Sequence, residues 1–102
     1  RVPVFVGHSE AVNVEFEDAI SLEAAREALA DAPGVVLLDR PDEDIYATPI
    51  EAAGENAVYV SRLRVDPSVE YGLAMWVVSD NLRKGAATNA VQIAEKLVET
   101  YL

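Results

Sequence analysis

Apolar and polar residues are spaced along this chain in a way that predicts both strands and helices. Stretches with short β-branched runs or two-residue alternation, typical of strands, lie near residues 2 to 6, 9 to 16, 34 to 39, 57 to 64 and 72 to 78. Two stretches, near 22 to 31 and 81 to 100, repeat apolar residues at three- and four-residue spacing, as amphipathic helices do. Ser21 and Asp80 precede them as candidate N-caps. The pattern predicts an α+β fold with a mostly antiparallel sheet.

The last predicted strand is apolar on both faces, and strands of this kind are covered on both sides. Two helices are few for covering both faces of a five-stranded sheet. We therefore expect another protein surface, either a missing domain or a second copy, against one face. On the preceding strand, alternation assigns Arg62 and Arg64 to the same face as Val60, opposite Leu63. We expect these arginines to pair with carboxylates, and the alternative is a phosphate or carboxylate ligand.

Composition narrows the class of protein. A chain of 102 residues that is 51% apolar is long enough for one domain with a modest core. Eighteen acidic against eight basic residues give a net charge of −10, which disfavours nucleic acid as a partner. No apolar run approaches the roughly 20 residues of a membrane span, and no leader peptide is evident, so we expect no membrane partner and a cytoplasmic protein. The chain opens on Arg1 rather than methionine, as expected of a fragment.

Candidate chemistry concentrates in the first sixteen residues, which hold the single histidine of the chain. Gly7 interrupts the strand pattern, and at such a break His8 can point into a cleft, with Arg1 just upstream. The alternative is a buried histidine whose ring is hydrogen-bonded to a backbone carbonyl. With one histidine and no cysteine, the chain has no disulfide, and we expect no metal site.

Three motifs in order, Arg1 to Val4, Gly7 to Val12 and Asp80 to Ala87, resemble the C-terminal part of aspartate-semialdehyde dehydrogenase. This resemblance implies a glyceraldehyde-3-phosphate-dehydrogenase-like C-terminal domain. Residues 1–80 would be the second part of the substrate and dimerisation domain. Residues 81–102 would be a C-terminal helix that packs on a cofactor domain absent from this sequence.

The resemblance also implies an activity and roles for three residues. The activity is NADPH-dependent conversion of aspartyl-4-phosphate to aspartate-4-semialdehyde, on the pathway to lysine, threonine and methionine. Arg1 would bind the substrate carboxylate, His8 would be the acid/base partner of a cysteine nucleophile, and Asn81 would help hold the nicotinamide end of NADP. The assembly would be a dimer or tetramer formed through the sheet face.

This sequence departs from the family pattern in two ways. It has no cysteine to act as the nucleophile, and it has no glycine-rich dinucleotide fingerprint. We therefore expect the fragment to be inactive alone. A rival interpretation is a free-standing, non-catalytic dimerisation or small-ligand-binding module with a ferredoxin-like layout.

Overall fold

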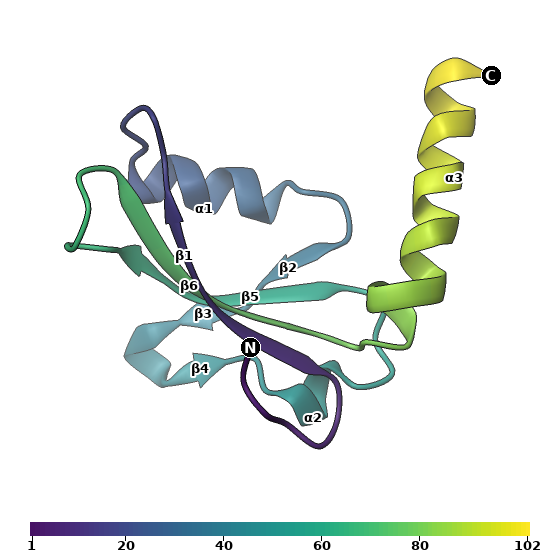
Figure 1. Cartoon of the computed structure of the whole chain (residues 1–102), viewed down its shortest axis with the longest axis horizontal. Helices are drawn as coiled ribbons and strands as arrows, with labels where there is room; N and C mark the ends of the chain where they lie inside the picture. Colours follow the sequence, from purple (N-terminus) through teal and green to yellow (C-terminus); the bar gives the residue numbers. More distant parts are fainter.

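The computed structural model describes all 102 residues and is built around a four-stranded sheet (Figure 1). The strands lie in the order β1 (His8–Glu15), β6 (Gly72–Ser79), β5 (Val58–Val65) and β2 (Val35–Leu37). Strand β2 is parallel to β5, and the other neighbours are antiparallel. A two-stranded ribbon of β3 (Asp39–Arg40) and β4 (Ile45–Tyr46) follows β2. The predicted α+β class and mostly antiparallel sheet are confirmed.

The helical elements are α1 (Leu22–Ala30), the 3₁₀ turn η1 (Pro41–Glu43), α2 (Pro49–Ala52), the π-helical turn η2 (Arg83–Ala87) and α3 (Thr88–Tyr101). Ser21 caps α1 as predicted, because its hydroxyl accepts a hydrogen bond from the backbone N–H of Ala24 at 3.1 Å. Asp80 likewise accepts bonds from the N–H groups of Leu82 at 2.8 Å and Arg83 at 3.0 Å. The first turn of the helix predicted over 81 to 100 is η2, which is π-helical rather than α-helical.

Two small cores lie on opposite faces of the sheet. Helix α1 covers one face, where the buried residues are Ala25, Leu63 and Leu73. Helix α2 and the segment before it cover the other, where the buried residues are Ala47, Ala52 and Val78. The indole N–H of Trp76 donates to the Ala47 carbonyl at 2.9 Å and ties this second layer to β6. The chain itself thus covers both ends of the apolar strand β6, and the middle of that strand stays half-buried.

The prediction of a strand over residues 2 to 6 is wrong. Only Val2 pairs there, through one antiparallel bridge in which its N–H donates to the Ser9 carbonyl at 2.9 Å. Pro3 has no N–H to extend a ladder, and Gly7 takes the left-handed conformation at φ 68° that turns the chain into β1. The predicted strand over 34 to 39 is also shorter, since β2 ends at Leu37.

Strand β5 contains a bulge that the alternating pattern did not predict. Ser61 lies opposite Trp76, but Arg64 lies opposite Ala74, so one extra residue is inserted between them. Arg62 accommodates the insertion, because its backbone adopts the left-handed conformation at φ 54°. The insertion reverses the faces beyond it, so Arg64 lies on the same face as Ser61, and the face assigned to it from alternation is wrong.

Helix α3 extends away from the sheet (Figure 1). Its large apolar side chains are exposed, namely Val91, Ile93, Leu97, Val98 and Tyr101. Neither α3 nor any other helix has the length and apolar character that crossing a bilayer requires. The stripe predicted from the three- and four-residue spacing exists, and within this chain its large apolar side chains remain more than half exposed.

Candidate functional site at the start of strand β1

The first candidate site is formed where the N-terminal segment meets the outer edge of β1. The bridge between Val2 and Ser9 is antiparallel, so Arg1 lies alongside Glu10. His8 is the first residue of β1, and it lies opposite Ser79 of β6. The fold therefore brings Arg1 and His8 to the same end of the edge strand, as their closeness in sequence suggested.

His8 is partly accessible to solvent and has a charged neighbour. Its Nε2 atom lies 3.0 Å from Oε1 of Glu10, and the side chains are 38% and 40% exposed. The two residues are two apart on one strand, so they share a face of the sheet. The alternative of a buried histidine bonded to a backbone carbonyl is therefore wrong.

The charge on Glu10 is stabilised mainly by this contact. The hydrogen bond with His8 lowers the pKa of Glu10 below its ordinary value of 4.5, and the positive charge of Arg1 adds to this effect. Sequence reasoning assigned no role to Glu10. The two-residue spacing from His8 on a predicted strand was the signal that could have identified it.

Asn81 lies at the same end of the sheet, two residues beyond the position opposite His8. It is exposed, in a turn that the Asp80 carboxylate fixes through three backbone N–H groups, including that of Gly54 at 2.7 Å. These bonds, with the Gly54 contact the largest, lower the pKa of Asp80 below 3.8. No cluster of three or more histidine, aspartate or glutamate side chains is arranged to hold a metal ion.

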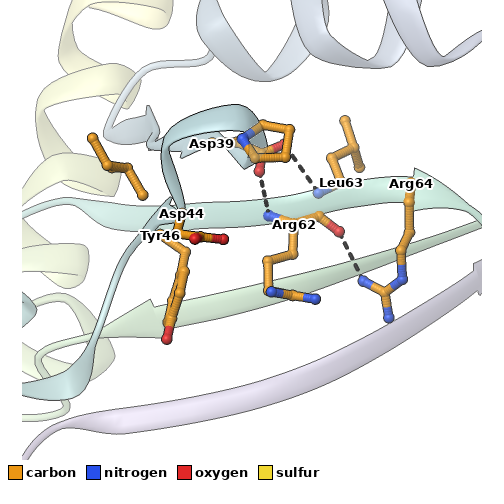
Figure 2. A pocket seen from close by; sticks show the side chains of 8 residues that line it. Asp39, Asp44, Tyr46, Arg62, Leu63 and Arg64 are labelled. Atoms are coloured by element: carbon orange, nitrogen blue, oxygen red, sulfur yellow. Dashed lines mark hydrogen bonds between the residues drawn. The ribbon is translucent and has the colours of Figure 1, made fainter.

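A second candidate site is a cavity of about 350 Å³ between β5 and the β3–β4 ribbon (Figure 2). Asp39 organises it: its side chain is 2% exposed, and its Oδ1 accepts from the N–H of Arg62 at 2.7 Å. The other oxygen, Oδ2, accepts from the N–H of Leu63 at 3.1 Å and from Arg26 at 2.5 Å. This carboxylate therefore holds the bulge of β5 in place.

Neither arginine beside this cavity pairs with a carboxylate. Arg64 donates to the backbone carbonyl of Arg62 at 2.8 Å, and the guanidinium of Arg62 lies 5.8 Å from the centre of the Tyr46 ring (Figure 2). The expected pairing of the arginines with acidic side chains is wrong. The alternating sequence pattern of β5 does not indicate the bulge. The role of Asp39, which binds the backbone of the bulge, could therefore not be predicted from the sequence either.

Comparison with known proteins decides the family. Residues 1–84 match the model described as semialdehyde dehydrogenase, dimerisation domain. The chain belongs to this family. Over 102 residues it is 58% identical to the aspartate-semialdehyde dehydrogenase of Aquifex aeolicus and 53% identical to that of Rickettsia bellii. Each match covers 100% of this chain and 30% of the relative, so the chain spans less than a third of the length of these enzymes.

Solved structures agree with this assignment. Aspartate semialdehyde dehydrogenase II from Vibrio cholerae is 48% identical, with a TM-score of 0.84 over 100% of this chain and 30% of that one. A probable aspartate-semialdehyde dehydrogenase from Pseudomonas aeruginosa is 35% identical, with a TM-score of 0.79 over 97% of this chain and 29% of that one. The predicted resemblance and the fold that it implied are confirmed.

Proposed function

We propose that the protein to which this chain belongs is an aspartate-semialdehyde dehydrogenase, which converts aspartyl-4-phosphate to aspartate-4-semialdehyde with NADPH and releases phosphate. The observation that carries this proposal is the similarity of the whole chain to relatives of that name, at up to 58% identity among those described above. The free-standing module has no comparable support.

In this proposal the site at the start of β1 supplies two groups to the reaction. Arg1 is exposed, and its planar guanidinium suits two parallel hydrogen bonds to the substrate carboxylate. His8, which is partly exposed, exchanges a proton with the cysteine nucleophile. That cysteine belongs to the part of the protein outside this chain, because none of the 102 residues is a cysteine.

The cofactor makes little contact with this chain. The exposed amide of Asn81, held in the turn fixed by Asp80, fits a single polar contact to the nicotinamide end of NADP. The bound cofactor supplies the hydride for the reduction. No glycine-rich loop is present to hold its phosphates, so most of its binding site lies outside this chain.

The two parts of the chain have different structural roles in this proposal. Residues 1–80 contribute the sheet face through which a dimer or tetramer forms, which the family description as a dimerisation domain supports. Residues 81–102 pack on the cofactor domain. The exposed apolar residues of α3 favour this, since an amphipathic helix is stabilised mainly by burying its apolar face.

The experiment that tests the proposal is a kinetic comparison of His8→Asn with the unmodified full-length protein. Asparagine keeps a polar group but cannot exchange a proton, so kcat should fall by about 10² to 10⁴ while KM changes little. The isolated 102-residue chain should show no turnover, since it has no thiol nucleophile. A kcat within a few-fold of the unmodified value in His8→Asn, with the thermal unfolding temperature unchanged, would make His8 a structural residue.

A further inference from the structure

We propose that Glu10 is a positioning residue for His8: it holds the imidazole ring through Nε2, which leaves Nδ1 as the nitrogen that exchanges the proton with the nucleophile. This inference rests on the proposed function, since it assigns a partner to the acid/base histidine. It follows from a contact in the structure that the sequence motif did not identify as functional.

The His8–Glu10 contact has the geometry of a hydrogen bond. Oε1 of Glu10 lies 3.0 Å from Nε2 of His8, which is a normal length for a hydrogen bond between them. A carboxylate only accepts hydrogen bonds, so the neutral imidazole must carry its proton on Nε2 to make this contact. Nδ1 then carries the lone pair. A proton leaving a thiol can go only to Nδ1, and Nε2 keeps its bond to Glu10 throughout.

The backbone of β1 holds the two side chains in fixed positions. His8 and Glu10 are both on β1, and their positions opposite Ser79 and Val77 of β6 are fixed by the ladder. Neither of these β6 residues carries a charge that could compete for the imidazole or the carboxylate. Residues two apart on a strand project from the same face, so the contact requires no rearrangement of the backbone.

Glu10 also acts on His8 electrostatically. When His8 accepts a proton it becomes an imidazolium, and a carboxylate at hydrogen-bond distance stabilises this positive charge. The lowered pKa of Glu10 means that the carboxylate is ionised at neutral pH. The contact is 40% exposed on the Glu10 side, so part of this effect is screened by water. Orientation and tautomer selection are therefore the main contributions.

The role of Glu10 predicts a particular kinetic pattern in the full-length protein. Glu10→Ala should lower kcat by about tenfold or more with little change in KM, because Glu10 acts on proton transfer and does not touch the substrate. Glu10→Gln should recover part of this loss, since its amide oxygen can still accept from Nε2 although the charge is gone. Glu15→Ala is the matched control: Glu15 is an exposed carboxylate on the same strand, and it makes no contact with His8.

Two further readouts separate this role from a merely structural one. In a His8→Asn background, Glu10→Ala should have no additional effect on kcat, because its action passes through His8. In protein labelled with ¹⁵N-histidine, the signals lost in His8→Asn identify the His8 ring. Those signals should report a proton on Nε2 in the unmodified protein and a mixture of tautomers in Glu10→Ala.

The outcomes distinguish this inference from the proposed function. If His8→Asn abolishes most of kcat but Glu10→Ala does not, Glu10 has no positioning role and the proposed function stands. Equal effects of Glu10→Ala with and without His8 would also overturn the inference, because Glu10 would then act on another group. If His8→Asn has no effect on kcat, the catalytic assignment fails, and the inference fails with it whatever the ¹⁵N signals report.

Discussion

At the scale of single residues, Arg1 is free to bind an anion although a carboxylate lies close by. The bridge between Val2 and Ser9 puts Arg1 beside Glu10, yet the hydrogen bond that forms there joins Glu10 to His8. Arg1 affects Glu10 only through its charge. No hydrogen bond or ion pair joins the Arg1 guanidinium to Glu10, so its donors remain available for the substrate carboxylate in the proposed function.

Substitution of Arg1 should therefore affect substrate binding more than proton transfer. In the full-length protein, Arg1→Leu should raise KM and lower kcat together, because the lost carboxylate contact also positions the carbonyl. Arg1→Lys should recover only part of the loss, since an ammonium cannot reproduce two parallel bonds. Arg40→Leu, at an exposed arginine paired with Glu43, is the control and should leave both constants unchanged. Full recovery in Arg1→Lys would contradict a bidentate contact.

The residues that could be predicted from the sequence are those with local signals. Ser21 and Asp80 were identified as caps because a cap depends on neighbours within three residues, and the structure confirms both. The role of Asp39 depends instead on residues 23 and 24 positions away, and no local pattern reports contacts of that range. The predicted roles of His8 and Asn81 came from the resemblance, and they remain predictions.

At the scale of elements, the strands β5 and β6 could be predicted, but the bulge in β5 could not. The spacing of apolar residues predicted both strands, and their observed bounds differ from the prediction by one residue at most at either end. The bulge depends on one residue, Arg62, in a conformation that arginine seldom adopts. It is stabilised from outside the hairpin by the Asp39 carboxylate, so the hairpin sequence alone could not reveal it.

The left-handed conformation of Arg62 leads to a prediction about stability. A β-branched side chain is strained there, so Arg62→Val should lower the free energy of unfolding by about 1 to 2 kcal/mol. Arg40→Val is the control: it loses the same charge at an exposed strand position that makes no contact with the bulge, and valine is favoured in strands. Urea denaturation of the two variants measures the difference. Equal stabilities would show that the bulge relaxes at little cost.

The turn before α3 should depend on pH through Asp80. Because the backbone bonds lower the pKa of Asp80 in the folded state, its contribution to stability is present above the unfolded value of 3.8 and is lost as pH falls below it. Asp80→Asn should therefore reduce the free energy of unfolding at pH 7, and the difference from the unmodified protein should shrink below about pH 4. Asp42→Asn, an exposed carboxylate on η1, controls for the loss of one negative charge. A difference that stays constant with pH would contradict this role.

At the scale of the whole molecule, the chain leaves much of its apolar surface exposed. Only 11 of 102 residues are buried, which is few for a chain that is 51% apolar. The exposed apolar residues lie mainly on α3 and on the N-terminal segment, where Phe5 is fully exposed. The prediction of a partner surface from the sequence is consistent with this. However, that prediction was based on the two apolar faces of the strand that became β6, and α1 and α2 already cover both ends of this strand.

We expect a second copy to bind at the open part of the sheet. We call the side of the sheet that carries Trp76, Ala11 and Asn13 the Trp76 face; Ala11 lies opposite Trp76, and Asn13 is two residues further along β1. Ala11 and Asn13 are exposed there, whereas Val12 and Val14 on the opposite face are partly covered. An interface on the Trp76 face would bury the half-exposed Trp76, whereas its half-exposed neighbours Met75 and Val77 lie on the face that α1 covers.

Self-association of the full-length protein should therefore be sensitive to a charge on this face. Ala11→Glu adds an unpaired carboxylate at an exposed position, so it should shift the protein toward the monomer without disturbing its own core. Trp76→Glu is a poorer test, because it also removes the hydrogen bond to Ala47. Ala28→Glu, on the exposed side of α1, is the matched control and should leave the assembly intact. Sedimentation equilibrium at micromolar concentration measures the oligomeric state of the unmodified protein, Ala11→Glu and Ala28→Glu. A clean monomer of the unmodified protein, or an Ala11→Glu variant that assembles as well as Ala28→Glu, would exclude the Trp76 face as the interface.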